Sequence, residues 1–432
     1  MASDAAGERL PGLQKDQFNV SVELVALRIS PKQCAGFMAR LSGHVLHRPK
    51  VKAIIAPPDA NEREAKLLLL NEGVRDTSLT ELPTELREYV LAEGAVAERH
   101  TLKLTYEHLT AEQVLRTLLP SGMEVPSAFE QIGHVAHVNL REEHLPYKAT
   151  IGEVLLDKNA PRIRSVVNKV ESISNEFRVF PMELLAGDPS LRTSVRENGA
   201  KFELDYSEVY WNSRLETEHK RVLELLPENG VIADGFAGIG PFAVPAAMRG
   251  CRVYANDLNP KSHEWLAVNV AGNKVANRVK TYNMDGRAFI QALLHPTAPM
   301  PDDGAGSGGA ASETSTPALP MGPFSHVLMN LPASALTFLD AFVGAFDRAT
   351  WQAPLPTVHC YCFSKAADPA ADVIAIAEQT MGCTLVDPKV TVVRDVAPQK
   401  LMLCLSFQVP DAVAWSTTEE QADERSKRLR TE

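Results

Sequence analysis

The sequence predicts an α/β protein whose C-terminal half is a seven-stranded, mainly parallel sheet covered by helices. From about residue 216, short apolar runs typical of buried strands alternate with longer helical stretches. The first strand runs into the glycine-rich turn "DGFAGIG". Two strand-like runs, "KVTVVRDV" and "LMLCLSFQV", follow each other directly near the end, so we expect this pair to be antiparallel. Alternating strands and helices favour parallel pairing with helices on both faces.

The strands and helices of this half follow one another in a fixed order. The strand "GVIADGF" precedes the helix "PFAVPAAMRG", which stops at Gly250. The strand "CRVYAND" precedes a helix that starts at Pro260, where a missing N–H costs nothing. The next strands are "RVKTYN", "HVLMN" and "TVHCYCF", and they are followed by the helices "GRAFIQALL", "SALTFLDAFVGAF" and "PAADVIAIAEQTMG".

Shorter elements precede the sheet domain and divide the rest of the chain. The expected parts are a disordered N-terminus, a first α+β domain, a middle α+β domain, the sheet domain and a flexible tail, over residues 1–16, 17–125, 126–215, 216–410 and 411–432. The first domain opens with the strand "FNVSVELVALRI" and the helix "PKQCAGFMARLSGHVL". Segment 296–323 is rich in Gly, Ser, Pro and Ala and cannot bury apolar surface, so we predict a disordered insertion without a catalytic role.

The composition is that of a soluble globular protein with no membrane partner. The 432 residues are 45% hydrophobic and 23% charged, and their apolar stretches are too short to span a bilayer. The first residues lack a basic start followed by an apolar core, which argues against a secretory signal and leaves a mitochondrial one open. The six cysteines form no C-x-x-C pair, so we expect buried free thiols and no metal site.

The net charge of −10, averaged over the chain, argues against a nucleic-acid partner. The stretch "DKNAPRIRSVVNK" (157–169) nevertheless holds four basic residues and one acid. Such a strip can bind phosphate, although a solvated loop is the more common meaning of a basic run.

The glycine-rich turn is the strongest local signal for a ligand. A strand ends at Asp234, and Gly238 and Gly240 let a ligand approach the backbone closely because no Cβ intervenes. Such a turn fits nucleotides, flavins and S-adenosylmethionine alike, and a plain tight turn is the alternative.

Two further acids lie at the ends of the next two strands. Asp257 lies 19 positions after Gly238, where a carboxylate can accept both ribose hydroxyls of an adenosine ligand, and Asp285 can receive the exocyclic amine of adenine. Each acid alone could simply cap a helix. Three in succession, without a phosphate-binding motif, favour S-adenosylmethionine over a dinucleotide.

The fourth strand, in "VLMNLPAS" (327–334), ends at Asn330, whose amide offers one acceptor and two donors to a planar base. In a sheet with this strand order, the end of the fourth strand is expected to lie beside the sulfonium of a bound S-adenosylmethionine. No aromatic residue follows Asn330 to stack on a base, since the next residues are Leu331, Pro332 and Ala333. The target is therefore expected to be a ring nitrogen or carbon rather than an exocyclic amine.

The motifs "HVNLREEHLPYK", "FRVFPMELLAG", "DGFAGIGPFAVPAA", "ANDLNP", "NLP" and "VRDVAPQKLMLCLSF" resemble the tRNA (guanine-37-N1)-methyltransferases of archaea and eukaryotes. The resemblance covers residues 17–410 and is densest over 133–290. It implies a Rossmann-type class I methyltransferase domain preceded by two smaller domains, with S-adenosylmethionine as cofactor. It also implies a monomer that binds the anticodon loop and body of tRNA, in the cytoplasm and nucleus with a possible mitochondrial matrix pool.

The implied reaction is methylation of N1 of guanosine 37, which supports reading-frame maintenance and can begin wybutosine synthesis. Guanine N1 is protonated at neutral pH, so a base must remove this proton; the resemblance gives that role to Glu218. Charge then moves to O6, where the guanidinium of Arg178 would stabilise it. The alternative for Glu218 is a helix-surface ion pair with Arg214 or Arg221, and Arg178 alone would read as a surface charge.

The resemblance completes two sets of candidate site residues, with Asn330 also assigned to catalysis. The cofactor would be held by Arg214, His219, Asp234, Phe236, Gly238, Gly240, Asp257, Leu258, Asn259, Asp285, Gly286 and Asn330. The RNA would be held by Tyr210, Trp211, Pro332, Lys158, Arg162, Arg164 and Lys169, where core packing is the alternative for the two aromatic residues.

Three other functions compete with methyl transfer. An aminocarboxypropyltransferase of the wybutosine pathway has the same fold and cofactor. A catalytically dead methyltransferase fold that only binds tRNA is the second, against which the intact Glu218, Arg178 and strand-end acids argue. A dinucleotide oxidoreductase is the third.

Overall fold

The computed structural model describes residues 13–59, 64–170, 179, 181–294, 323–351 and 354–416. Arg178 and nearly all of the predicted insertion lie outside the described residues. The described chain forms two compact units. The first contains residues 13–131, 135–169 and 183–189, and the second contains residues 132–134, 190–416 and the described residues of 170–182.

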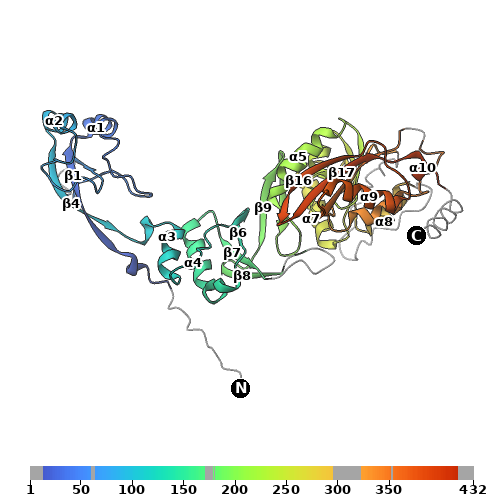
Figure 1. The fold of residues 1–432 in the computed structure, drawn as a ribbon, viewed down its shortest axis with the longest axis horizontal. Helices are drawn as coiled ribbons and strands as arrows, with labels where there is room; N and C mark the ends of the chain where they lie inside the picture. The colour runs from blue at the N-terminus through green and yellow to red at the C-terminus, as the bar shows by residue number, and fades with distance from the viewer. Residues whose placement is uncertain are drawn as a thin grey trace, which may run out of the picture. The chain divides into compact units, whose positions relative to one another are not determined.

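The first unit begins with a four-stranded sheet of order β2-β3-β1-β4, in which neighbouring strands are antiparallel. Its strands are β1 (Val20–Ile29), β2 (Ile54–Ile55), β3 (Lys66–Leu69) and β4 (Val96–Leu104), and its helices are α1 (Cys34–Arg40) and α2 (Thr84–Ala92) (Figure 1). The predicted first strand and helix are both present. Val25, Leu27 and Leu68 are buried with Phe37 and Val90, so both helices cover the same face.

A second sheet in this unit has the order β5-β6-β7-β8. Its strands are β5 (Glu130–Ile132), β6 (Val135–Val138), β7 (Ser165–Lys169) and β8 (Met182–Gly187). The helices α3 (Ala111–Leu118) and α4 (Lys148–Asn159) bury Val114, Leu115, Ile151 and Val154 with Val166 of β7. Part of the segment predicted to be disordered packs here as well, because Lys15–Phe18 forms a 3-10 helix and Lys15 pairs with Asp157 at 2.9 Å.

The second unit contains the seven-stranded sheet, whose order is β13-β12-β11-β14-β15-β17-β16 (Figure 1). Its strands are β11 (Val231–Asp234), β12 (Arg252–Asn256), β13 (Val279–Tyr282), β14 (His326–Met329), β15 (Thr357–Ser364), β16 (Lys389–Ala397) and β17 (Lys400–Gln408). The first five are parallel, whereas β17 runs antiparallel to both of its neighbours. The predicted fold class and the predicted antiparallel final pair are confirmed.

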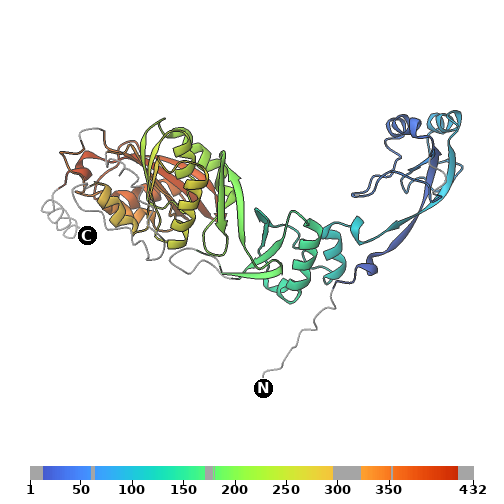
Figure 2. The same cartoon turned by 180° about the vertical axis from the view of Figure 1, so that it is seen from behind.

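Helices lie on both faces of this sheet (Figure 2). On one face, α8 (Gly286–Leu294), the 3-10 helix η6 (Ala335–Phe342) and α9 (Pro369–Met381) share a core with Cys360 and Cys362. On the other face, Tyr361 of β15 donates a hydrogen bond to Glu218 of α5 (Glu216–Leu225). The next two helices along the chain are α6 (Ala243–Met248) and α7 (Pro260–Gly272). A hairpin of β9 (Arg192–Glu197) and β10 (Ala200–Asp205) precedes α5.

Two elements differ from the predictions. The predicted helix "SALTFLDAFVGAF" is instead the 3-10 helix η6, which ends at Phe342 because the N–H of Gly344 bonds to the carbonyl of Val413 at 2.8 Å. The predicted flexible tail begins with a short helix, α10 (Asp411–Ala414).

The six cysteines are all free, and Cys251, Cys360, Cys362 and Cys404 are buried. Within the described ranges, no three His, Cys, Asp or Glu side chains are grouped as metal ligands. None of the described helices has the length and apolar character that crossing a membrane requires.

Candidate active site

The structure brings four polar strand ends to one edge of the large sheet. Asp234 ends β11, and Asp257, Asp285 and Asn330 follow β12, β13 and β14. These four strands are parallel neighbours in the order β13-β12-β11-β14, so their carboxyl ends meet at the same edge. Ligands of open α/β sheets bind at this edge, beside the point where the strand order reverses.

The glycine-rich turn is fixed to the neighbouring strand end. The N–H of Gly238 donates to the Asp257 carboxylate at 2.8 Å. Gly238 and Gly240 have φ angles of +55° and +99°, which strongly favour glycine. A Cβ on Gly238 would meet no atom within 4 Å, whereas one on Gly240 would lie 2.8 Å from a methyl carbon of Leu266. Gly238 therefore faces open space, while Gly240 is needed for packing.

Asp234 carries an uncompensated buried carboxyl group. It is fully buried, and no donor of the described residues is in hydrogen-bonding geometry with either oxygen. Burial, opposed in part by the nearby N–H of Phe236 and aided by the Asp257 carboxylate, raises the pKa of Asp234 to about 8. With this pKa the carboxyl group is largely protonated at neutral pH, and a cationic ligand at the glycine turn would favour its charged form.

Asp257 is positioned to accept hydrogen bonds from a ligand. Burial raises its pKa to about 6, although the N–H groups of Asn259 and Gly238 and the hydroxyl of Ser262 oppose the rise. Asp257 as a whole residue is half-buried, and the following Leu258 is exposed. A carboxylate with this pKa is ionised at neutral pH and is then a strong acceptor for hydroxyl groups.

Asn256 holds the strand ends in place and was not predicted from the sequence. Its buried side-chain amide donates to the carbonyls of Gly235, at 3.2 Å, and Met284, at 2.9 Å. Its side-chain carbonyl accepts the N–H of Met284 at 3.0 Å. The signal was a polar residue at the end of an otherwise apolar strand. Asn256 thus connects the loops that follow β11 and β13.

Asp285 and Gly286 have structural roles of their own. One oxygen of Asp285 accepts the N–H groups of Arg287 and Ala288, each at 3.0 Å, which is the arrangement of a helix cap. Its side chain is exposed, and its second oxygen makes no hydrogen bond among the described residues, so capping leaves it available to a ligand. A Cβ on Gly286 would lie 2.7 Å from the ring of Phe236. The Phe236 ring therefore packs directly on this helix start.

Asn330 lies at the tip of β14 with its amide available. The side chain is half-buried and makes no hydrogen bond within the part of the chain that the structure describes. The carbonyl of Leu331 accepts the N–H groups of Ser334 and Ala335, which closes a tight turn around the half-buried Pro332. The amide can therefore bind a ligand without losing an internal partner.

Glu218 is buried in a hydrogen-bonded group rather than paired at the surface. Arg221 donates to both of its oxygens, at 2.6 and 2.7 Å, and the hydroxyl of Tyr361 donates at 2.9 Å. The carboxylate raises the pKa of Arg221. Met329 pairs with Cys360, so Asn330 and Tyr361 follow at the same level of adjacent strands. The Arg221 pair considered as an alternative is thus present, but it lies inside the protein and near the tip of β14.

His219 is also engaged internally. Its Nδ1 contacts the carboxylate of Glu197 on β9, and both residues are buried. The imidazole packs edge-on against Phe242, with 4.7 Å between ring centroids. Its Nε2 is buried and has no hydrogen-bond partner among the described residues. His219 therefore joins the β9–β10 hairpin to the segment that follows the glycine turn.

Two asparagines, one in α7 and one directly after its end, attach the β9–β10 hairpin to the seven-stranded sheet domain. Asn269 exchanges two hydrogen bonds with the backbone of Glu203, at 2.7 and 3.1 Å, and also donates to the carbonyl of Ile239 in the glycine turn. Asn273 exchanges two with the backbone of Lys201, at 2.9 and 2.7 Å. These amides complete the free edge of β10 much as another strand would.

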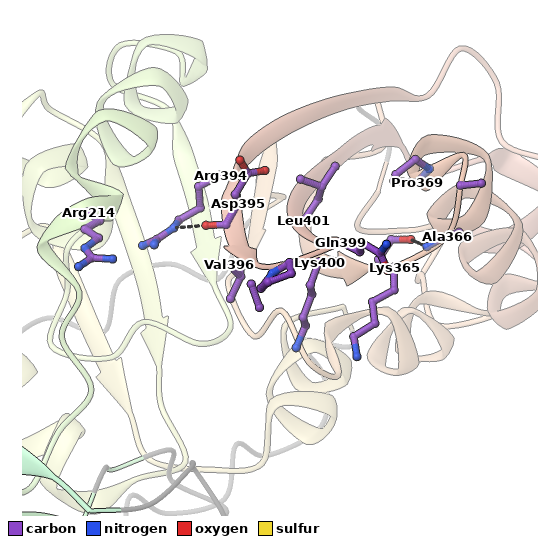
Figure 3. A pocket seen from close by; sticks show the side chains of 14 residues that line it. Arg214, Lys365, Ala366, Pro369, Arg394, Asp395, Val396, Gln399, Lys400 and Leu401 are labelled. Carbon is purple, nitrogen blue, oxygen red and sulfur yellow. Dashed lines mark hydrogen bonds between the residues drawn. The ribbon is translucent and has the colours of Figure 1, made fainter. Parts of the chain in front are cut away.

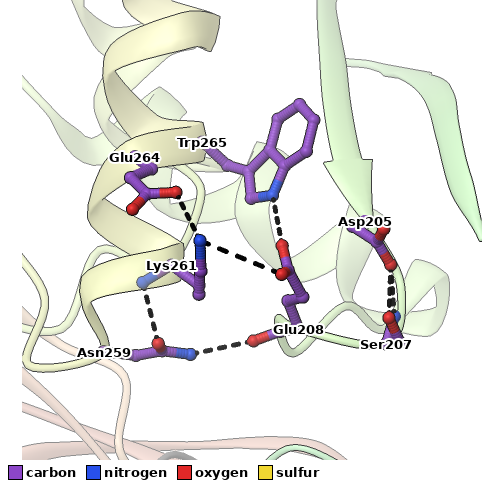
Figure 4. A network of polar contacts seen from close by, with 7 residues as sticks. All are labelled: Asp205, Ser207, Glu208, Asn259, Lys261, Glu264 and Trp265. Carbon is purple, nitrogen blue, oxygen red and sulfur yellow. Dashed lines mark hydrogen bonds and ion pairs between the residues drawn. The ribbon is translucent and has the colours of Figure 1, made fainter.

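The loop after β10 is tied to the start of α7 (Figure 4). Asn259 caps α7 by accepting the N–H of Lys261 at 2.9 Å, and it donates to the carbonyl of Glu208 at 3.0 Å. Trp265 and Lys261 contact the Glu208 carboxylate, at 3.4 and 3.9 Å. Asn259, a predicted cofactor residue, thus uses one end of its amide to cap α7 and the other to hold this loop.

Tyr210 and Trp211 follow that loop and differ in exposure. Trp211 is buried and packs on Phe202, with ring centroids 5.5 Å apart, which is the core packing considered as the alternative. Tyr210 is 38% exposed, and its hydroxyl accepts from Asn212 at 3.2 Å. Of the two, only Tyr210 presents an accessible ring.

The predicted phosphate-binding strip lies in the first unit. Lys158 is occupied there, because its ammonium donates to the carbonyl of Tyr106 and lies 3.4 Å from the centroid of that ring. Burial lowers its pKa. Arg162 and Arg164 are exposed and Lys169 is half-buried. The ammonium of Lys158 is therefore engaged inside the protein, whereas the two arginines are accessible, and phosphate binding by the strip stays a prediction.

Comparison with known proteins identifies two matching family models. The TRM5/TYW2 methyltransferase domain matches residues 193–296, and the TYW2 N-terminal domain matches residues 111–190. The tRNA (guanine(37)-N(1))-methyltransferase of Phytophthora infestans is 44% identical over 423 residues, which covers 96% of each chain. The protein of that name in Mus musculus is 42% identical over 418 residues, covering 96% of this chain and 79% of the mouse protein.

Among solved structures, the complex of aTrm5 and tRNALeu is similar, with a TM-score of 0.63 and 19% sequence identity. The likeness covers 89% of this chain and 100% of that one. At this identity it supports the fold.

Proposed function

The chain belongs to the family of tRNA (guanine(37)-N(1))-methyltransferases, and we propose that the polar edge of its seven-stranded sheet carries out that family's reaction. The enzyme transfers a methyl group from S-adenosylmethionine to N1 of guanosine 37 in tRNA. The observation that carries the assignment of the site is the meeting of Asp234, Asp257, Asp285 and Asn330 at one sheet edge.

The residues at this edge fit S-adenosylmethionine. The orphaned carboxyl of Asp234 suits a ligand that carries positive charge, and the open space beside Gly238 accommodates its approach. Asp257 would accept the ribose hydroxyls, and the second oxygen of Asp285 would accept the adenine amine. The cofactor supplies an electrophilic methyl group on a sulfonium. None of these contacts involves a phosphate.

Glu218 is proposed to accept the N1 proton of guanine. Losing this proton turns N1 into a nucleophile, which forms the new bond to the methyl carbon as the carbon–sulfur bond breaks. Arg178, which lies outside the described residues, would stabilise the charge that develops on O6. The amide of Asn330 would hold the base edge in register. The proton remains on Glu218 until solvent removes it.

The partners of Glu218 suit a base that must be held in position. Tyr361 and Arg221 donate three hydrogen bonds to the carboxylate and fix its orientation. Proton transfer requires one oxygen to exchange an Arg221 donor for guanine N1. The oxygen bonded only to Arg221 Nε has one partner to lose, whereas the other has two.

Binding of tRNA follows from the family, and the finer contacts are part of the proposal. Tyr210 supplies the accessible ring for stacking the flipped base, and Arg162 and Arg164 supply exposed charges for phosphates. We also propose that the enzyme works as a monomer on the anticodon loop, in the cytoplasm and nucleus.

One observation favours an aminocarboxypropyltransferase as the second candidate function: residues 111–190 match a family model named for TYW2. The full-length relatives at 40–44% identity carry the methyltransferase name instead. One experiment distinguishes the two activities. The enzyme is incubated with S-adenosylmethionine and a tRNA transcript that has guanosine at position 37, and the mass of the product nucleoside is measured. Methyl transfer predicts 1-methylguanosine, and no product with adenosine at that position. Any aminocarboxypropyl product, or equal labelling of both transcripts, would contradict the proposal.

A further inference from the structure

A basic pocket lies in the second unit, at the end of β15 beside the β16–β17 hairpin (Figure 3). Its volume is about 890 Å³. Its lining includes Arg214, Lys365, Arg394 and Lys400. We call this site the hairpin pocket. Apart from Arg214, none of the residues assigned above to the cofactor or the base contributes to its lining.

The reversed direction of β17 brings the hairpin to this place. β15 ends at Ser364, which pairs with Leu401 near the start of β17. The turn between β16 and β17 therefore lies at the carboxyl edge of the parallel strands, the edge that also carries Asn330 and the acids. β15 is the direct neighbour of β14 in the sheet. The hairpin pocket thus lies at the same edge of the sheet as Asn330, beyond the end of the neighbouring strand β15.

Local backbone features shape the hairpin wall. β16 has two register shifts against β17, between Val392 and Arg394 and between Asp395 and Ala397. Such bulges increase the strand's twist and redirect side chains. Gln399 has a φ of +59°, so the turn is tight and left-handed at this position. The last residues of β16 therefore curl at the edge of the pocket instead of continuing a flat strand.

The charges in the hairpin pocket are mostly positive. Four cations line it, against the single carboxylate of Asp395, in a chain with a net charge of −10. Across the described ranges, no carboxylate forms an ion pair with Lys365, Arg394 or Lys400. Arg394 donates to the carbonyl of Asp395 at 3.2 Å, and the ammonium of Lys400 lies 4.1 Å from the Phe363 ring centroid. Their charges are therefore uncompensated and accessible to an anion.

We propose that the hairpin pocket binds backbone phosphates of the RNA substrate, next to the nucleotide that is methylated. The proposal rests on the proposed function, which supplies a polyanion at this sheet edge. A flexible lysine binds a phosphate as a point charge, while the fork of an arginine can bind it in two places. Phosphate contacts position a nucleic acid without reading its sequence. The pocket thus sets the register of the RNA strand.

The test is a double variant, Lys365→Ala with Lys400→Ala, compared with Lys389→Ala. Lys389 is an exposed lysine of the same β16 strand that pairs with Ser406, at the end away from the pocket, which makes it a matched control. The probe is the unmodified tRNA transcript with guanosine at position 37. Its affinity is measured between low and moderate salt, together with S-adenosylmethionine affinity, kcat and melting temperature.

The double variant should bind the transcript roughly tenfold more weakly at low salt, with little change for the control. The slope of log affinity against log salt should become shallower by about 1.4, or 0.7 for each lost single-strand phosphate contact. The turnover at saturating transcript, the cofactor affinity and the melting temperature should stay near wild type.

Two results would overturn the proposal. One is an unchanged salt slope with less than a twofold loss of RNA affinity. The other is an equal loss of cofactor affinity, which would assign the pocket to S-adenosylmethionine. A failure of the proposed function would give a different result from a failure of this proposal. The wild-type enzyme would then leave guanosine 37 unmethylated, regardless of the RNA affinity of the variants.

Discussion

The hydroxyl of Tyr361 donates a buried hydrogen bond of 2.9 Å to the carboxylate of Glu218. The two residues are 143 positions apart, one on the central sheet and one on α5. The bond fixes the proposed base relative to the strand that neighbours the tip of β14. A helix side chain is thereby held by the same sheet that carries Asn330.

Replacing Glu218 with Gln should remove most of the activity. Gln cannot accept the N1 proton, so we expect kcat to fall roughly 100- to 10,000-fold, the range of general-base catalysis. Affinity for S-adenosylmethionine should stay within about twofold. Single-turnover methylation and equilibrium binding measure the two quantities, with Glu224→Gln on the exposed side of the same helix as the control. Equal loss of both quantities would exclude the base role.

The Tyr361→Phe variant removes only the hydroxyl. We expect the free energy of unfolding to fall by about 1 kcal/mol, the value of one hydrogen bond, and kcat to fall roughly tenfold because the base is less well positioned. KM for tRNA should not change. Denaturant unfolding and steady-state kinetics provide the measurements. A variant that loses stability but keeps its full kcat would show that Tyr361 is purely structural.

Binding of S-adenosylmethionine should weaken as the pH falls below about 6. Asp257 has a pKa of about 6 and is the better acceptor for ribose hydroxyls when ionised, so protonation removes part of the affinity. Calorimetric titrations between pH 5 and 8 measure this effect. An Asp257→Asn variant should bind weakly at every pH. If that variant keeps the wild-type pH dependence, another group is responsible.

Stability of the ligand-free protein should fall as the pH rises from about 4 to 8 because of Asp234. Its folded pKa of about 8 exceeds its ordinary value of 3.8, so the folded state binds more protons in this range and each rise in pH favours unfolding. Asp234→Asn removes the buried charge. Its melting temperature should exceed that of the wild type at pH 8, and the difference should shrink toward pH 4. A constant difference across this range would refute the assignment.

Asn269→Ala should destabilise the second unit by roughly 2 kcal/mol or more. The change leaves the backbone groups of Glu203 and the carbonyl of Ile239 without their partner, and buried unpaired groups are costly. Asn273→Ala is the control, because its partner Lys201 is exposed and water can replace the lost bonds. Thermal unfolding gives the comparison. Equal losses in the two variants would show that burial does not decide the effect.

The sequence predicted the sheet and its polar edge well, because strand periodicity and strand-end acids are local signals. It did not reveal the long-range pairs that hold the site. Tyr361 looked like one apolar residue among others, and Glu197 gave no sign that it would contact His219. The inward direction of Lys158 depends on Tyr106, which lies 52 positions earlier. Pairings of this kind are set by packing between distant segments, which periodicity does not encode.

The antiparallel course of β17 has a consequence for how the enzyme is assembled. Without the β16–β17 hairpin, β15 would be the edge strand of the sheet. No segment would then lie beside it at the carboxyl ends of the parallel strands. The reversal sends a late segment of the chain back to this place. The wall of the hairpin pocket is therefore completed late in synthesis, after the strands that lead to Asp234, Asp257, Asp285 and Asn330 have already emerged.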